Sequence, residues 1–231
     1  MIKVKYLGHS GFLVEMEQAY FLFDYYEGAL PKFDLKKELY VFVSHRHYDH
    51  YREEIFQLRS QIENIWFVIS SDVKAEKFEK EDTIYVNPNE EISVGSSRIK
   101  TLRSTDEGVA FLVRYDDIVL YHAGDLNWWH WDGEPDEYNS HMEQNYKCEI
   151  DKLAKEKIDI AFVPVDPRLG NAYSLGLHYF LEQTESKYVF PMHFWGNYDC
   201  LAQLKSEEEI KKYGEKIIAV EEEGQCISLE F

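Results

Sequence analysis

Short apolar runs separated by polar turns dominate the first half of the chain. IKVKYL and GFLVEM predict two strands with the turn-forming Gly8 and Gly11 between them. The runs AYFLF (19–23), LYVFV (39–43) and IWFVI (65–69) predict three more strands. Residues 51–60 are polar and compatible with a helix, and ISV, RIKTL, VAFLVRY and IVLYH then predict a meander of strands.

The second half alternates long polar segments with apolar runs. Residues 136–157, 174–184 and 201–213 predict helices, while IDIAFVPV (158–165) and KYVFPM predict buried strands. No linker rich in Gly, Ser or Pro divides the 231 residues. We therefore expect a single domain over residues 1–231, of mixed α/β class. Two sheets inside and helices outside, a four-layer αββα sandwich, would satisfy this order of elements.

Composition narrows the classes of function. The formal net charge is −18, and a field of that sign repels phosphate backbones, so nucleic-acid binding is disfavoured. No apolar run reaches the roughly 18 residues of a membrane span, and the first residues lack the apolar stretch of a signal peptide. We expect a cytoplasmic protein without a membrane partner. The three cysteines are far apart, which favours neither a disulfide framework nor a cysteine zinc site.

One stretch concentrates metal-binding side chains. HRHYDH (45–50) follows the apolar run 39–43 directly and holds three of the nine histidines. In an extended segment His45 and His47 project to the same face, and Asp49 and His50 follow where the chain turns. Imidazole and carboxylate together suit zinc, manganese or iron.

Two later strand ends carry further candidate ligands. Asp125 follows the run IVLYH in YHAGD, and His193 follows YVF in FPMHFW. Ends of buried strands are places where α/β folds build sites.

With these residues the sequence resembles the metallo-β-lactamase superfamily of metal-dependent hydrolases. The HxHxDH motif is matched by His45, His47, Asp49 and His50, the aspartate of the GD motif by Asp125, and the final histidine by His193. The opening YLGHSGFLVE, with Asp24 after the next run, resembles the branch that includes ascorbate-phosphate lactonases. The resemblance covers nearly the whole chain and implies the four-layer αββα sandwich.

The resemblance also implies how one or two divalent ions would be held. One ion would be bound by His45, His47 and a third histidine, the other by Asp49, His50 and His193, with Asp125 bridging. Zinc is the expected metal, with manganese or iron as alternatives. A metal-bound water would be the nucleophile, and Asp49 would also orient it and accept its proton.

The chain departs from the family at the third histidine of the first ion. LRSTDEGVAFLV stands where that histidine is expected, and no histidine lies between His50 and His122. Three alternatives stay open. Asp106 supplies an oxygen ligand, which would favour a harder ion such as manganese; the first site is weak and one ion is held; or the protein is a catalytically impaired homologue.

Three other stretches are candidates for shaping the substrate. In NWWHWDGE (127–134), Trp129 either walls a pocket or fills core, and His130 near the metal could protonate a leaving group. Arg168 in VDPRLG is a candidate anion clamp, or it forms a salt bridge with a partner such as Asp166. His178, in the predicted helix 174–184, is a further substrate-binding candidate.

These observations predict a metal-dependent hydrolase of a small anionic ester, lactone or phosphodiester. A non-catalytic metal-binding or ligand-sensing homologue with a degenerate first site is the rival from another class. Redox activity is the weakest alternative, because redox members usually carry glutamate at the position of His47.

Overall fold

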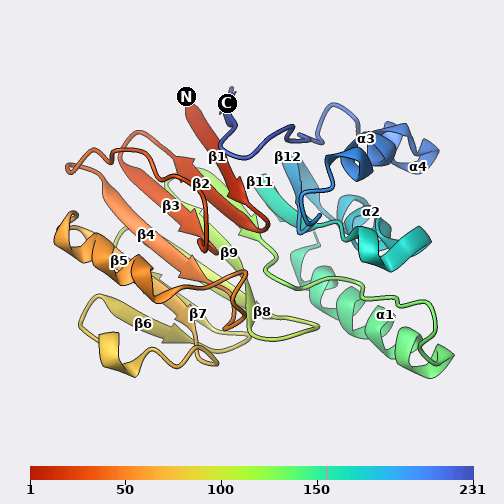
Figure 1. Ribbon diagram of the computed structural model, residues 1–231, viewed down its shortest axis with the longest axis horizontal. Coiled ribbons are helices and arrows are strands. Elements are labelled where there is room, and N and C mark those ends of the chain that lie inside the picture. The colour runs from red at the N-terminus through yellow and green to blue at the C-terminus, as the bar shows by residue number, and fades with distance from the viewer. Residues whose placement is uncertain (155) are drawn as a thin grey trace. The chain divides into compact units, whose positions relative to one another are not determined.

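The computed structural model describes residues 1–154 and 156–231, which form two compact units. Unit 1 comprises Met1–Asn87 and Glu221–Phe231, and unit 2 comprises Pro88–Val220. Each unit holds one sheet, and Figure 1 labels the strands and helices of both. The prediction of a single domain stays a prediction.

The sheet of unit 1 has seven strands in the order β13-β1-β2-β3-β4-β5-β6. The strands from β3 to β6 run parallel, while β13, β1, β2 and β3 pair antiparallel. Ile2 pairs with Leu229, so the two chain ends lie side by side (Figure 1). The strand bounds are β1 (Ile2–Gly8), β2 (Gly11–Glu15), β3 (Ala19–Phe23), β4 (Glu38–Val43), β5 (Ile65–Ser70), β6 (Thr83–Val86) and β13 (Cys226–Leu229).

Both faces of this sheet are buried, which explains the continuous apolar runs of β3, β4 and β5. On one face Leu22 and Val41 belong to a core that includes Ile55 of the 3-10 helix η1 (Glu53–Ser60). On the other face Phe21 stacks on Tyr40 of the neighbouring strand, with ring centroids 5.1 Å apart. The predicted helix at 51–60 is therefore a 3-10 helix that covers one face of the sheet.

The sheet of unit 2 has six strands in the order β12-β11-β10-β9-β8-β7. The strands β10, β11 and β12 are parallel, so their carboxyl ends meet at one edge, and β7, β8, β9 and β10 form the predicted antiparallel meander. The bounds are β7 (Glu91–Val94), β8 (Ser97–Arg103), β9 (Val109–Tyr115), β10 (Ile118–His122), β11 (Lys157–Pro164) and β12 (Glu185–Met192).

The helices of unit 2 follow the predicted polar segments, with differences at their ends. Helix α1 spans Asp136–Ile150 and carries two acidic residues in its first turn, where the helix dipole favours negative charge. It ends in a 3-10 turn, η3 (Asp151–Leu153), so the predicted helix to 157 is too long, and position 155 lies outside the described residues. Helix α2 (Leu175–Gln183) confirms the prediction for 174–184.

The predicted helix at 201–213 is wrong in its bounds, because two helices occupy this region. Helix α3 spans Tyr198–Ser206 and α4 spans Glu208–Lys211, with Glu207 in an extended conformation between them. The carboxylate of Glu207 accepts hydrogen bonds from the hydroxyls of Tyr173 and Ser174. These tertiary contacts hold Glu207 where the helix is interrupted.

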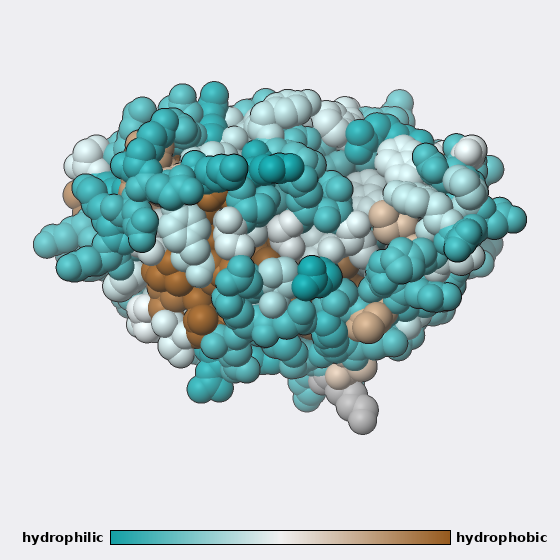
Figure 2. Space-filling model, turned by 90° about the horizontal axis from the view of Figure 1, so that it is seen from below, coloured by the Kyte–Doolittle hydropathy of each residue, from teal (hydrophilic) through white to brown (hydrophobic). Residues whose placement is uncertain are grey.

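The face shown in Figure 2 is mostly hydrophilic, with hydrophobic residues gathered in one area toward the left of the view. This agrees with a charged fraction of 29% and a net charge of −18. Among the described residues, no helix has the length and apolar character needed to cross a membrane.

Candidate metal centre

In unit 1 the candidate site begins where two neighbouring parallel strands end. Asp24 follows β3 and Ser44 follows β4, and the amide of Asp24 donates to the carbonyl oxygen of Phe42. Asp24 takes a positive φ of 41°, a conformation that non-glycine residues seldom adopt. The backbone turns here, and the HRHYDH loop follows from the end of β4.

Asp24 organises this loop through a fully buried carboxylate. Its Oδ1 accepts the amide of Ser44 at 2.7 Å, and its Oδ2 accepts the Ser44 hydroxyl at 2.6 Å. Oδ2 also lies 2.7 Å from Nδ1 of His50. A carboxylate accepts only, so the proton of His50 sits on Nδ1 and Nε2 carries the lone pair that can bind a metal.

Ser44 orients the ring of His45 in a similar way. The Ser44 hydroxyl gives its proton to Asp24 and lies 3.0 Å from Nδ1 of His45, which therefore donates to it. Nε2 of His45 and Nδ1 of His47 are 3.0 Å apart, a separation that lets one ion bind both nitrogens. The expectation that these two histidines project together agrees with this distance.

Asp49 lies beside a histidine from the opening turn of the chain. Nε2 of His9 is 3.4 Å from the Asp49 carboxylate, and one ligand atom each of His9, Asp49 and His50 lie within 4.8 Å of one another. Burial raises the pKa of Asp49, but the hydrogen bond from His9 and the charge of His50 outweigh it, and the pKa falls to about 2. Asp49 is therefore an anion at neutral pH, and His9 joins the donor set that the sequence motif alone defined.

In unit 2 a second donor set lies at the carboxyl ends of β10, β11 and β12. Nε2 of His193 is 3.3 Å from Oδ1 of Asp125, and Nδ1 of His193 is 3.1 Å from Oδ2 of Asp166. All three side chains are buried, and Asp166 is fully so. The pair predicted at two strand ends is thus brought together, with Asp166 as the carboxylate that orients His193.

Asp166 also holds the predicted anion clamp. Nε of Arg168 lies 2.9 Å from Oδ2 of Asp166 and 3.0 Å from its Oδ1, and the Arg168 amide donates to Oδ1 at 2.9 Å. Burial raises the pKa of Asp166, but the hydrogen bonds from His193 and Arg168 lower it to about 2. The salt bridge foreseen as the alternative for Arg168 is therefore present, and it fixes the guanidinium.

Asp106 lies near Asp125 within unit 2. Ligand oxygens of these two residues are within 4.8 Å of each other, and Asp106 is exposed. The loop is anchored by Thr105, whose hydroxyl donates to the carbonyl oxygen of Asn127 at 2.6 Å. A carboxylate oxygen thus lies near Asp125, and the replacement of the missing histidine by Asp106 stays a prediction.

The tryptophans after Asp125 have different neighbours. The rings of Trp129 and Trp131 are stacked with centroids 6.1 Å apart, whereas Trp128 carries Lys147 over its ring. Trp129 donates its indole N–H to the carbonyl oxygen of Asp125, so it supports the loop as well as standing beside the site.

Two other candidates have less direct support. His130 is half-buried in the loop after β10, and its amide donates to the carbonyl oxygen of Trp128. His178 places Nε2 3.7 Å from Glu182 and 3.8 Å from Glu209, so the structure connects it with α4. The roles of His130 as a proton donor and of His178 in substrate binding stay predictions.

Gly176 allows the loop after Asp125 to approach α2 closely, because a Cβ atom at position 176 would lie 2.1 Å from Oδ1 of Asn127. We expect Gly176→Ala to lower the free energy of unfolding by about 1–3 kcal/mol through overpacking. Chemical denaturation measures this change. The double variant Gly176→Ala/Asn127→Ala removes the clashing oxygen, so its loss should be smaller than the sum of the single losses. Additive losses would contradict the proposed clash.

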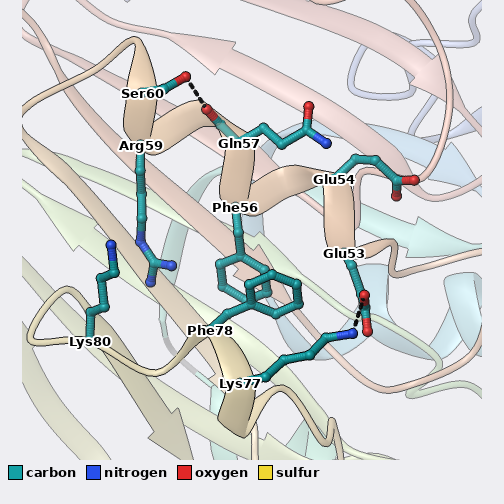
Figure 3. Close-up of a pocket in the computed structure, with 9 residues that line it drawn as sticks. All are labelled: Glu53, Glu54, Phe56, Gln57, Arg59, Ser60, Lys77, Phe78 and Lys80. Carbon is teal, nitrogen blue, oxygen red and sulfur yellow. Dashed lines mark hydrogen bonds and ion pairs between the residues drawn. The ribbon is translucent and has the colours of Figure 1, made fainter.

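A separate pocket of about 540 Å³ lies in unit 1 between η1 and the 3-10 helix η2 (Glu76–Phe78) (Figure 3). The rings of Phe56 and Phe78 stack with centroids 4.5 Å apart. Lys77 pairs with Glu53 at 2.6 Å, as the dashed line in Figure 3 shows. These contacts join the two helices, and none of the predicted site residues line this pocket.

Comparison with known proteins agrees with the predicted fold family. A family model described as a beta-lactamase superfamily domain matches residues 3–130, more than half of the chain. A UPF0173 metal-dependent hydrolase of Pyrococcus horikoshii is 24% identical over 84% of this chain and 85% of its own.

Two solved structures share the fold along their whole length. The metallo hydrolase Igni18 of Ignicoccus hospitalis has a TM-score of 0.66 at 18% identity and covers 100% of this chain and 99% of its own. The metallo-beta-lactamase fold protein YhfI of Bacillus subtilis has a TM-score of 0.63 at 16% identity, covering 99% and 100%. The predicted α/β fold of the metallo-β-lactamase type is confirmed.

Proposed function

Because the chain belongs to the beta-lactamase superfamily, we propose that it is a metal-dependent hydrolase of a small anionic ester, lactone or phosphodiester. A relative that is named a metal-dependent hydrolase covers most of the chain and supports the reaction class. The net charge of −18 supports a small substrate over a nucleic acid. We place the protein in the cytoplasm on the sequence expectation.

The orientation of three histidines carries this proposal. Nδ1 of His45, His50 and His193 lies within hydrogen-bond distance of a buried side-chain oxygen, from Ser44, Asp24 and Asp166 respectively. Tethering Nδ1 makes Nε2 the metal-binding atom and fixes the ring, an arrangement typical of metal ligands. A core histidine that serves packing alone would not need this arrangement three times.

The donor chemistry fits a divalent ion. Imidazole nitrogens and carboxylate oxygens are the ligands of zinc, and carboxylates extend the choice to manganese and iron. We propose as ligands His45, His47, Asp49 and His50 from unit 1 and Asp106, Asp125 and His193 from unit 2. The sequence resemblance supports a shared centre for the two donor sets.

The chain's own residues would then have separate tasks. A bound ion would supply Lewis acidity and a water of lowered pKa as the nucleophile. Asp49, an anion at neutral pH, would orient that water and receive its proton, and Nε2 of His9 lies 3.4 Å from the Asp49 carboxylate. We assign the protonation of the leaving group to His130 and contacts with the substrate to Trp129, Arg168 and His178.

Metal content and chelator-sensitive hydrolysis test the proposal together. The protein is purified without chelator, incubated with zinc or manganese, and assayed with bis(4-nitrophenyl) phosphate and dihydrocoumarin. We expect at least one bound ion per chain, with hydrolysis that EDTA removes and added metal restores. The absence of bound metal after this incubation would reject the proposed enzymatic function. Bound metal without hydrolysis of either probe would favour the non-catalytic metal-binding alternative.

Asp106 is the proposed replacement for the third histidine, and it has its own prediction. We expect the wild-type chain to bind two ions and Asp106→Ala to bind one, because the carboxylate close to Asp125 is removed. Elemental analysis of metal per chain measures the difference. Asp117→Ala, which removes another exposed carboxylate of unit 2, should keep both ions. Equal metal content in Asp106→Ala and the wild type would rule out this ligand.

A further inference from the structure

Three loops of unit 2 meet around the guanidinium group of Arg168. They follow β10, β11 and β12, and they contribute Trp131, Arg168 and Trp195 respectively. The guanidinium carbon of Arg168 lies 4.6 Å from the ring centroid of Trp195 and 5.7 Å from that of Trp131. Both distances are within the range of cation–π attraction.

These contacts belong to a closed series of side-chain contacts that includes His193, a candidate metal ligand. Trp131 stacks on Trp129, Trp129 meets His193 edge to face at 5.5 Å, and His193 meets Trp195 edge to face at 5.6 Å. Trp195 then returns to Arg168. The Arg168 guanidinium is thus part of the cluster of aromatic side chains around His193.

Trp195 adopts a backbone conformation that side-chain sterics disfavour for a bulky residue. It takes a positive φ of 54°, His193 two positions earlier has a φ of 64°, and Gly196 directly after it has a φ of 67°. A bulky non-glycine residue in the left-handed region is strained, and strain of this kind clusters at ligand sites. Trp195 is also 42% exposed, although large aromatic side chains are usually well buried.

Arg168 is oriented before any ligand arrives. Asp166 binds it along the edge formed by Nε and Nη2, and the planar guanidinium therefore directs its Nη1 end away from Asp166. The Arg168 side chain is 48% exposed. An oxyanion can approach the exposed guanidinium and receive charge-assisted hydrogen bonds, while a flat group attached to it rests on the exposed indole of Trp195.

We propose that Arg168, Trp131 and Trp195 form a subsite that binds an oxyanion attached to a flat organic group and orients the substrate beside His193. The oxyanion is a carboxylate or a phosphate that does not itself react. This inference rests on the proposed hydrolase function for its role. It goes further by naming the chemistry of the substrate's non-reacting part and by adding Trp195, which the motifs did not reveal.

Equilibrium binding tests the subsite without turnover. The full chain, as purified and again after dialysis against EDTA, is titrated by tryptophan fluorescence with benzoate, phenyl phosphate, acetate and inorganic phosphate. The EDTA sample separates binding at Arg168 from binding to a metal. We expect the ring-bearing anions to bind more tightly than the corresponding ions without a ring, in both samples.

Variants assign the binding to the named residues. Arg168→Gln should weaken benzoate binding about tenfold or more, because charge-assisted hydrogen bonds are lost. Arg114→Gln removes another ion-paired arginine of unit 2 and should bind like the wild type. Trp195→Ala should erase the preference for benzoate over acetate while acetate binding persists, and Trp195→Phe should keep part of the preference. Trp66→Phe serves as the tryptophan control, and circular dichroism confirms folding.

The outcomes separate the subsite from the enzyme. Tighter binding of phenyl phosphate assigns a phosphate, and tighter binding of benzoate assigns a carboxylate. Equal affinity of Arg168→Gln and the wild type after EDTA dialysis overturns the subsite, as does the absence of binding by every probe. A chain that holds no metal but still binds benzoate through Arg168 would reject the hydrolase and keep the subsite.

Discussion

His45→Ala is expected to lose bound metal and to lower probe hydrolysis by about 10³-fold. His45 is buried, its Nδ1 is tethered by Ser44, and its Nε2 lies 3.0 Å from His47. Removing it takes one nitrogen from the proposed first ion. A bound ion contributes several kcal/mol to the stabilisation of a hydrolytic transition state, and about 4 kcal/mol corresponds to about 10³ in rate.

A histidine outside the donor set provides the matched control. His141 lies exposed on α1, so His141→Ala should keep the metal content and rate of the wild type. Asp125→Asn removes a proposed ligand of unit 2. If the two donor sets serve one centre, this variant should lose metal as His45→Ala does. Wild-type metal content and rate in His45→Ala would overturn the assignment of the HRHYDH motif.

The strands were the most predictable part of the fold, for a physical reason. The parallel strands β3, β4 and β5 are buried along their length, so their sequences are uninterrupted apolar runs. The strands that the prediction missed, β6 and β13, have more exposed or half-buried positions and show no such run. A local run of apolar residues indicates burial. These two strands form chiefly because each pairs with a neighbouring strand.

The site was predictable where ligands are clustered along the chain, and less so where the fold assembles them. The HRHYDH motif is recognisable from six consecutive residues, whereas Asp166 and His193 are 27 positions apart in the chain. The sequence indicated Asp166 only as a neighbour for Arg168. Likewise, the aromatic residues near His193 were visible in the sequence. The contact between the Arg168 guanidinium and the face of the Trp195 ring, however, depends on a positive φ of Trp195 that the sequence does not indicate.

Asp24→Ala is expected to lower the free energy of unfolding by about 3 kcal/mol or more, the cost of leaving buried hydrogen-bonding groups without their shared acceptor. The carboxylate is fully buried and accepts from the amide and hydroxyl of Ser44, and it lies 2.7 Å from Nδ1 of His50. Alanine offers no acceptor, and water has no ready access there. Denaturant unfolding, compared with the wild type, measures the loss.

The same change is expected to weaken metal binding by about 10- to 100-fold, the usual effect of removing a residue that orients a ligand. Asp24 directs His50 itself and directs His45 through the Ser44 hydroxyl, so both rings lose their orientation at once. Zinc titration against a competing chelator, below the unfolding temperature of the variant, measures the affinity. Glu63→Ala, which removes an exposed carboxylate of the same unit, should change the free energy of unfolding by less than about 0.5 kcal/mol and leave zinc affinity unchanged. Normal zinc affinity in a folded Asp24→Ala protein would show that the histidines hold their positions without Asp24, because packing around the loop alone would then suffice.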